Sequence, residues 1–333
     1  MSLSNNSNIL EVDKLKKWFS ISKGFSISIS RKEKFLKAVD DVTFNVKKGE
    51  IIALAGESGS GKTTTGRLIT RLLDPTSGSI RFEGVDITKL KEKTFKSYRR
   101  KMQMIFQNPF DAINPRLSVF DTIKEPLMFH DQIKSPKEQK EKVKELLTFV
   151  KLTPPETYLD KFPSSFSGGE LQRICIARAL ILNPEFILAD EPVSMLDVSV
   201  RAGILNFFTD LRDNFDTSII FITHDIAMAS YVADRMMVMY MGKLMEEGPI
   251  ELIISNPLNP YTRCLIASVP HPDPTREPTR ATLKGEPATP IDPPLGCRFN
   301  PRCPNVMSIC RKEEPTLRDY GEGHKAACFL YDK

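Results

Sequence analysis

Eight consecutive residues, GESGSGKT at positions 56–63, match the spacing G-x-x-x-x-G-K-[ST]. Glycines at these positions let successive backbone N–H groups turn inward and bind phosphate oxygens at a helix N-terminus. Lys62 can neutralise the β- and γ-phosphates of a nucleotide, and the hydroxyl of Thr63 can ligate Mg²⁺. An apolar run, IIALA, precedes the motif and a helix-like run follows it, as this chemistry requires. The motif predicts a nucleotide site at Gly56, Glu57, Ser58, Gly59, Ser60, Gly61, Lys62, Thr63 and Thr64.

Two adjacent acids follow a second apolar run, in FILADE. Asp190 comes directly after four apolar residues, so it should project from the carboxyl end of a buried strand. In a protein with a phosphate loop, an acid at this place holds Mg²⁺, usually through water. Glu191 is then placed to orient or deprotonate an attacking water, the alternative being a helix-capping acid. The two acids predict hydrolysis of the bound nucleotide.

The segments around these residues predict an α/β fold with a parallel sheet. IIALAG, EFILADEP and TSIIFITHD have the composition of buried parallel strands, and helix-like segments flank them. Residues 18–36 alternate apolar with small or polar side chains around Lys23 and Gly24, which predicts a hairpin of an antiparallel β subdomain. Residues from about 108 to 182 are mostly helix-like and predict a helical subdomain.

The composition of the chain changes near residue 260. We expect a nucleotide-binding domain over residues 1–260 and, over residues 261–333, a proline-rich linker followed by a small cysteine-rich extension that forms a separate module. The start of the sequence lacks a signal-peptide pattern, and no run approaches the roughly 20 apolar residues of a membrane helix. A net charge of +5 is too mild to indicate nucleic-acid binding.

Further motifs follow the phosphate loop in a fixed order. FSGGELQR, at residues 166–173, resembles the signature of ABC ATPases, which separates them from other phosphate-loop enzymes. Gln107 in MIFQNP resembles the glutamine loop, and His224 in ITHD resembles the switch histidine. SMLD, ending at Asp197, resembles the D-loop. The order of these motifs over residues 39–260 is similar to that of the ABC ATPase family.

The resemblance implies ATP as the nucleotide and a role for each matched residue. Gln107 would contact Mg²⁺ and the attacking water, and would couple both to a membrane partner. Asp197 would cross a dimer interface, and His224 would touch the γ-phosphate. The signature residues, which would bind the γ-phosphate held by the opposite subunit, are Ser167, Gly168, Gly169 and the adjoining Glu170.

Three features of the resemblance are less specific. An aromatic side chain would stack on adenine, and Phe35 is the candidate, with Phe25 and Phe19 as alternatives. Glu170 replaces the usual glutamine of the signature; because it stands three residues after a serine, it completes a capping box and should stabilise the signature helix. Met195 stands where the D-loop more often has a small residue, which leaves the D-loop contact open.

Longer segments narrow the resemblance to one branch of the family. IFQNPFDAINPRLSV, DEPVSMLDVSVRAGILNFF and NPYTRCLIASVP are similar to the ATPases of dipeptide and oligopeptide permeases, of the second of their two ATPase types. That branch implies a peripheral protein on the cytoplasmic face of the cell membrane. Its partners would be a second ATPase (a paralogue or another copy), two transmembrane permease subunits and, indirectly, an extracytoplasmic solute-binding protein. Two ATP molecules would lie between head-to-tail ATPase subunits.

Other functions remain as alternatives to peptide import. Related systems import nickel or oligosaccharides. An ABC ATPase acting on nucleic acid usually has coiled coils, tandem cassettes or strongly basic linkers, which this chain lacks. A phosphate-loop kinase would leave the signature unexplained.

Four of the six cysteines lie near the C-terminus. Cys297, Cys303, Cys310 and Cys328 are separated by five, six and seventeen residues, which is not the spacing of a zinc ribbon. Without a signal peptide a reducing compartment is expected, where such a cluster more often binds a metal. Four thiolates suffice for zinc or for an iron–sulfur cluster.

The extension of the peptide-permease ATPases resembles CRFNPRCP followed by two further cysteines with a histidine near the last. That resemblance implies a [4Fe–4S] cluster on the four C-terminal cysteines. The alternatives are Zn²⁺, disulfides or unligated thiols. His324 is expected to make a local hydrogen bond, and Cys175 and Cys264 are expected to be packing residues.

Overall fold

The computed structural model describes residues 7–21, 34–130, 132–133, 135–194, 196–268, 290–291 and 293–332. The chain forms two compact units. The first unit comprises Met1–Ser7, Lys47–Ile51 and Lys89–Ile222, and the second comprises Asn8–Val46, Ile52–Thr88 and Thr223–Lys333. The acids of FILADE and the signature motif belong to the first unit, and the phosphate loop and the described cysteine-rich extension belong to the second.

Parallel strands form the centre of the first unit. They are β6 (Met102–Ile105), β7 (Phe186–Asp190) and β8 (Ser218–Thr223), paired in the order β6-β7-β8. Every residue of β7 and β8 is buried, which explains why both strands are continuous apolar runs in the sequence. The predicted parallel strands in EFILADEP and TSIIFITHD are confirmed.

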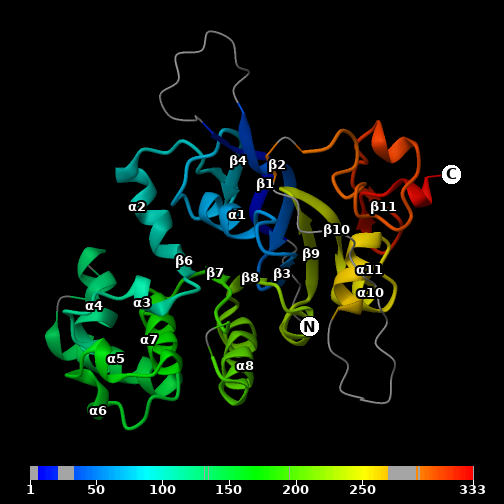
Figure 1. Cartoon of the computed structure of the whole chain (residues 1–333). Helices are drawn as coiled ribbons and strands as arrows, with labels where there is room; N and C mark the ends of the chain where they lie inside the picture. The colour runs from blue at the N-terminus through cyan, green and yellow to red at the C-terminus, as the bar shows by residue number, and fades with distance from the viewer. Residues whose placement is uncertain are drawn as a thin grey trace, which may run out of the picture. The chain divides into compact units, whose positions relative to one another are not determined.

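The helices of the first unit are α2 (Glu92–Lys101), α3 (Pro109–Ala112), α4 (Val119–Phe129), α5 (Pro136–Phe149), α6 (Glu156–Leu159), α7 (Gly168–Leu180) and α8 (Val198–Phe215), with a 3₁₀ turn at Pro163–Ser165. Helices α4 and α5 pack on each other and on α7 (Figure 1). Ser118 and Ser135 start α4 and α5 as N-caps, each accepting a hydrogen bond from a backbone N–H three residues on. The mostly helical character predicted for residues from about 108 to 182 is confirmed by α3 to α7.

An antiparallel sheet forms one part of the second unit. Its strands, in the order β2-β1-β4-β5, are β1 (Asn8–Ser20), β2 (Phe35–Lys47), β4 (Ser77–Phe82) and β5 (Val85–Asp86). The N–H of Ile21 donates to the carbonyl of Lys34 at 2.9 Å, which joins the chain just beyond β1 to the chain just before β2. This agrees with the hairpin predicted over residues 18–36, whose turn at Lys23 and Gly24 lies outside the described residues.

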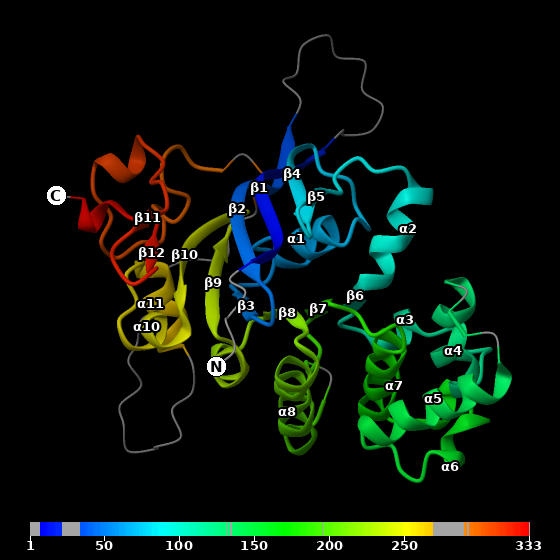
Figure 2. The same ribbon diagram turned by 180° about the vertical axis from the view of Figure 1, so that it is seen from behind.

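A second set of strands in this unit runs in the order β11-β12-β10-β9-β3. They are β3 (Ile51–Ala55), β9 (Arg235–Tyr240), β10 (Lys243–Pro249), β11 (Arg318–Asp319) and β12 (Lys325–Ala326). β9 is parallel to β3, and β10 is antiparallel to β9. The helices are α1 (Lys62–Ile69), α9 (Ile226–Val232), α10 (Ile250–Ser255) and α11 (Pro260–Ala267), with 3₁₀ turns at Ile309–Arg311 and Phe329–Tyr331. Helices α10 and α11 lie against β10 (Figure 2).

The cysteine-rich extension is part of this second unit. Its strand β12 pairs with β10, with Ala326 opposite Glu246 and Lys325 opposite Glu247. The outer edge of a strand offers N–H and C=O groups that another segment can pair with, and the extension uses that edge. The proline-rich composition of the preceding segment suggested a separate module; the structure instead places the extension in one compact unit with the phosphate loop.

Candidate functional site

The phosphate loop connects β3 to α1, as predicted. Gly56 and Gly61 have φ values of 148° and 107°, in the region that favours glycine. A Cβ at Gly56 would lie 2.2 Å from the carbonyl oxygen of Met239, and one at Gly61 would lie 2.2 Å from that of Ala38. Larger residues are therefore excluded by both backbone conformation and space, and the loop can follow a path that turns its N–H groups inward.

Lys62 is the first residue of α1 and is buried, with 5% of its surface exposed. Its ammonium group donates to the carbonyl of Gly56 at 2.7 Å, to that of Glu57 at 2.9 Å and to the hydroxyl of Ser60 at 3.4 Å. The ammonium is thus folded back over the loop, beside the N–H groups that open the helix. A positive side chain and a helix N-terminus together make a binding site for phosphate.

A second group of predicted residues meets in the first unit. Asp190 ends β7 and is 3% exposed. Glu191 follows it at a φ of 44° and its N–H donates to the carbonyl of Ile222 at 3.0 Å. The side-chain amide of Gln107 donates to the Glu191 carboxylate at 2.9 Å. The structure therefore joins the glutamine loop to the acid that sequence analysis assigned to water activation.

The signature motif opens α7. Ser167 is the N-cap residue, and its hydroxyl accepts a hydrogen bond from the N–H of Glu170 at 3.3 Å. The Glu170 carboxylate in turn accepts from the N–H and the hydroxyl of Ser167, both at 2.9 Å. The predicted capping box is confirmed. Gly168 and Gly169 form the first turn of the helix, so their N–H groups point from its N-terminus.

Because the hydrogen bonds of Glu170 within the described part of the chain are capping contacts, we expect Glu170→Gln to leave ATP turnover within about twofold of the unchanged protein. Glutamine can serve at the same position of a capping box. Glu170→Ala removes the reciprocal contact and should lower the melting temperature by a few degrees, for a cost of about 0.5–1 kcal/mol. Steady-state ATPase assays and thermal melts of both variants check this. A large gain or loss in turnover with Gln would reveal a catalytic role for Glu170.

The remaining predicted residues stand at the ends of elements. Asp197 is exposed and immediately precedes α8, in the first unit. His224 is exposed and directly follows β8, in the second unit. Exposure leaves both side chains accessible to a ligand or to a neighbouring subunit. Met195 lies outside the described residues.

The candidates for adenine stacking differ in their surroundings. Phe35 begins β2, half-buried, with its ring centroid 6.1 Å from that of Trp18. Three residues further along β2, the carbonyl of Ala38 faces the phosphate loop. Phe19 is 36% exposed, and Phe25 lies outside the described residues. Sequence analysis overlooked Trp18, which lies beside Phe35 and offers a second aromatic face.

The four C-terminal cysteines line one cavity of about 20 Å³. The spacing of the four cysteines in the sequence did not by itself predict that they lie together. Burial, with smaller contributions from the neighbouring thiols, raises the pKa of the Cys297 thiol to about 12. Burial also raises the pKa values of Cys303 and Cys328. All six cysteines are free, so disulfides are absent from these described positions.

Soft thiolates in an apolar pocket are suitable donors for iron or zinc. However, among the described residues no three histidine, cysteine or acidic side chains are grouped so that they could hold a metal ion. The four thiols are therefore chemically suited to bind a metal, but among the described residues they are not arranged as a set of metal ligands. Cys175 and Cys264 are buried and do not line this cavity, as expected of packing residues.

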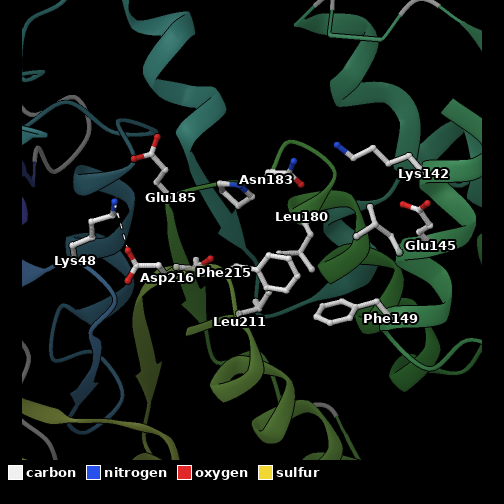
Figure 3. A pocket seen from close by; sticks show the side chains of 13 residues that line it. Lys48, Lys142, Glu145, Phe149, Leu180, Asn183, Glu185, Leu211, Phe215 and Asp216 are labelled. Atoms are coloured by element: carbon white, nitrogen blue, oxygen red, sulfur yellow. Dashed lines mark ion pairs between the residues drawn. The ribbon is translucent and has the colours of Figure 1, made fainter. Parts of the chain in front are cut away.

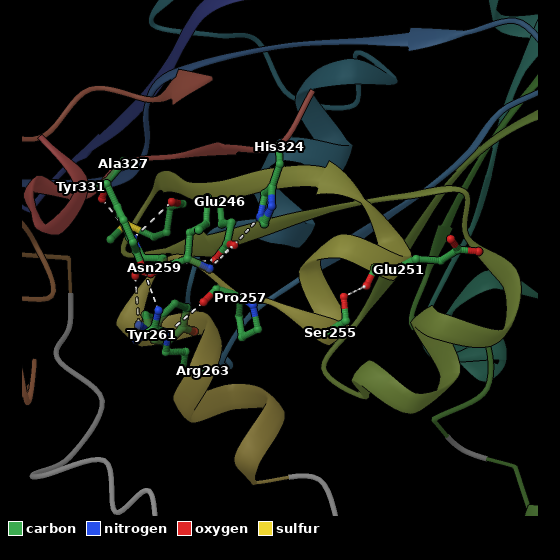
Figure 4. A network of polar contacts seen from close by, with 12 residues as sticks. Glu246, Glu251, Ser255, Pro257, Asn259, Tyr261, Arg263, His324, Ala327 and Tyr331 are labelled. Atoms are coloured by element: carbon green, nitrogen blue, oxygen red, sulfur yellow. Dashed lines mark hydrogen bonds and ion pairs between the residues drawn. The ribbon is translucent and has the colours of Figure 1, made fainter. Parts of the chain in front are cut away.

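His324 makes the local hydrogen bond that sequence analysis expected. Its Nε2 lies 2.7 Å from the fully buried carboxylate of Glu246 on β10 (Figure 4). The same carboxylate accepts from the N–H groups of Leu258 and Asn259 at 2.7 and 2.9 Å. Asn259 also donates to the carbonyl of Ala327 at 3.0 Å. This network ties α11, β10 and the extension together.

Two residues that sequence analysis missed contact the phosphate loop. The N–H of Glu57 donates to the hydroxyl of Tyr261 at 2.9 Å, and the Glu57 carboxylate pairs with the guanidinium of Arg302. Tyr261 begins α11 after its proline, and Arg302 lies within the segment CRFNPRCP. No local pattern links either residue to a motif some 200 positions earlier.

A further cavity, of about 430 Å³, lies in the first unit (Figure 3). Leu180, Leu211, Phe149 and Phe215 supply apolar side chains, and Lys48 forms an ion pair with Asp216 at 3.5 Å on its rim. None of the residues predicted for the nucleotide site lines it. Its place at the amino end of β7 separates it from the acids at the carboxyl end.

The α/β fold, the phosphate loop and the acids that end β7 define a phosphate-loop nucleotide hydrolase. Residues 39–194 match the family model described as ABC transporter, and residues 245–310 match that of the oligopeptide/dipeptide transporter C-terminal region. The oligopeptide transport ATP-binding protein AppF of Bacillus subtilis is 45% identical over 99% of this chain and 100% of its own length. The dipeptide transport ATP-binding protein DppF of Escherichia coli is 40% identical over 98% of this chain and 95% of its own.

Solved structures support the same assignment. A dimeric, post-hydrolysis structure of the ATP-binding cassette MJ0796 with ADP and phosphate has a TM-score of 0.65 and 27% identity. It covers 72% of this chain and 98% of that one. The chain belongs to the oligopeptide and dipeptide type of ABC transporter ATP-binding proteins. It is the ATP-binding subunit of a peptide importer, an ABC ATPase that couples ATP hydrolysis to transport, as the sequence motifs predicted. No helix among the described residues is long and apolar enough to cross a membrane.

Proposed function

We propose that this chain works as one of two ATPase subunits that close head to tail around two ATP molecules. Each site would combine the phosphate loop of one chain with Ser167, Gly168 and Gly169 of the other. The geometry of the signature supports this: three residues at a helix N-terminus present N–H groups and a hydroxyl suited to a γ-phosphate. The solved dimer of the cassette MJ0796 supports such pairing by analogy.

Within each ATP site, different side chains bind the phosphates, hold Mg²⁺ and activate the attacking water. Lys62 neutralises the β- and γ-phosphates, and Thr63 and Asp190 would hold Mg²⁺, which draws charge from the phosphate oxygens. Glu191 accepts the proton of the attacking water, and its hydrogen bond from Gln107 fixes the direction of the carboxylate. The other assigned contacts are His224 to the γ-phosphate, Asp197 to the opposite subunit and Phe35 to adenine.

We further propose that the chain acts on the cytoplasmic face of the cell membrane, bound to two transmembrane permease subunits, and that a solute-binding protein outside the membrane supplies peptides. The close relatives named for dipeptide and oligopeptide transport support these partners. ATP binding would favour one state of the transporter and hydrolysis would restore the other.

Co-expression tests this assignment. The tagged chain should co-purify with the two permease subunits, and ATPase activity of the complex in proteoliposomes should rise when binding protein and a di- or oligopeptide are added. Lys62→Ala in the same complex is the matched control and should remove that rise. Stimulation by nickel or an oligosaccharide in place of peptides would reassign the solute. Tight, salt-sensitive binding to DNA or RNA would overturn transport altogether.

For the extension, we propose that Cys297, Cys303, Cys310 and Cys328 ligate a [4Fe–4S] cluster. Their common cavity supports this assignment, as does the soft, apolar donor environment. Protein purified without oxygen should contain about four iron and four sulfide per chain. Cys310→Ser should lower both, whereas Cys175→Ser, which changes a cysteine outside the cavity, should not. One zinc per chain would assign Zn²⁺ instead, and a colourless, metal-free anaerobic sample would exclude both.

A further inference from the structure

The C-terminal extension reaches the phosphate loop through one buried arginine. Arg302 is 8% exposed, and its guanidinium forms two parallel bonds to the carboxylate of Glu57, Nη1 to Oε2 at 2.8 Å and Nη2 to Oε1 at 3.0 Å. A bidentate pair of this kind fixes the relative orientation of the two side chains as well as pairing their charges. The hydrogen bonds to Glu57 raise the pKa of Arg302, so the guanidinium stays charged. The partner residue, Glu57, is the second residue of the loop.

Glu57 is held at each of its polar groups. Its N–H donates to the Tyr261 hydroxyl at 2.9 Å, its carbonyl accepts from Lys62 Nζ at 2.9 Å, and its carboxylate is bound by Arg302. The lysine that faces the phosphates and the arginine of the extension therefore act on one residue. Without Arg302, a carboxylate that is largely shielded from solvent would remain within a loop that binds anions.

The extension itself is held rigidly enough to set the position of Arg302. Phe299, three residues earlier, is 1% exposed and packs against Tyr240 and Tyr261 with ring centroids 5.4 and 5.3 Å away. The N–H of Arg302 donates to the carbonyl of Phe299 at 3.0 Å. Arg298 forms a second buried ion pair, with Asp40 on β2. This second pair secures the extension without touching the phosphate loop.

We propose that Arg302 is a positioning residue for ATP binding: it neutralises Glu57 and holds it so that the phosphate loop accepts the nucleotide phosphates. The loop contacts phosphates that are bound both before and during hydrolysis, so losing this support should weaken binding more than it slows chemistry. A role limited to anchoring the extension predicts the opposite, namely less folded protein and an unchanged affinity in the folded fraction.

Arg302→Gln in the full-length chain tests the proposal. We expect the Kd for ATP, from calorimetric titration, and the KM to rise about tenfold, within the range for coupled neighbouring residues, with kcat kept within about twofold. Adding Glu57→Gln removes the carboxylate left behind, and the double variant should bind ATP at least about threefold more tightly than Arg302→Gln alone. Such recovery is expected if the arginine acts through Glu57, and it should exceed any gain from Glu57→Gln alone.

Two further substitutions serve as matched controls. Arg298→Gln breaks the other buried ion pair of the extension, and Arg311→Gln removes the same charge from an exposed position. Each should change the Kd by less than about threefold. Arg302→Lys keeps the positive charge but cannot form the two parallel bonds to Glu57, so it should weaken ATP binding about threefold. It is the variant to measure if Arg302→Gln does not fold. The proposal fails if Arg302→Lys or Arg302→Gln binds ATP normally, if Arg298→Gln matches Arg302→Gln, or if Glu57→Gln restores nothing.

Discussion

Replacing Lys62 by alanine is expected to abolish ATP turnover, with kcat/KM falling by at least about a hundredfold. Lys62 is buried, and its ammonium group donates hydrogen bonds to carbonyl oxygens of the phosphate loop. These bonds hold the positive charge beside the loop, where the nucleotide phosphates would bind. Alanine leaves the β- and γ-phosphates without that charge in a site where few waters can replace it. Steady-state ATPase activity and equilibrium binding of ATP measure the two consequences.

An exposed lysine supplies the control for this result. Lys93 lies on the surface of α2, and Lys93→Ala should leave both ATP binding and turnover within about twofold. A melting curve of each variant shows whether the protein remains folded. Turnover near that of the unchanged protein in folded Lys62→Ala would contradict the assignment of the phosphate loop.

The second large effect is expected from Glu191→Gln. The amide oxygen can still accept the hydrogen bond from Gln107, but the amide cannot take a proton from water. We expect kcat to fall by a factor of about 10²–10⁴ while ATP binding is retained. ATP should then hold two subunits together, so gel filtration with ATP should show a dimer for this variant and not for the unchanged protein.

Glu185 provides a matched carboxylate at the other end of the same strand. It immediately precedes β7 and forms an ion pair with Lys101 at 2.9 Å, far along the strand from Asp190. Glu185→Gln should leave the rate of hydrolysis and the ATP-dependent dimer unaltered. If Glu191→Gln hydrolyses ATP at the full rate, Glu191 is not the general base and another group must activate the water.

Local chemistry made much of the site predictable from sequence. The glycines of the phosphate loop, the apolar strand before it and the helix after it are adjacent in the chain, so one short segment carries the whole pattern. The capping box of Ser167 and Glu170 spans four positions and follows from helix geometry. The continuous apolar composition of β7 and β8 likewise reflects burial on both faces.

Contacts between distant segments could not be predicted in this way. Glu57 and Arg302 are 245 residues apart, and neither has a periodic or local feature that selects the other. The proline-rich composition before the extension suggested an independent module, because composition reports chain stiffness and not where the following segment packs. The meeting of four cysteines in one cavity also depends on turns that their uneven spacing does not specify.

The pairing of β12 with β10 bears on how much of this chain can be removed. Glu246 and Glu247 of β10 are buried, and the extension supplies His324 and Lys325 as their partners at 2.7 and 3.5 Å. A chain shortened before residue 293 would lose these partners and expose the backbone of β10 as an open sheet edge. Open edges of this kind recruit strands from other molecules and promote aggregation. We therefore expect a chain shortened before residue 293 to aggregate more readily than the full-length chain.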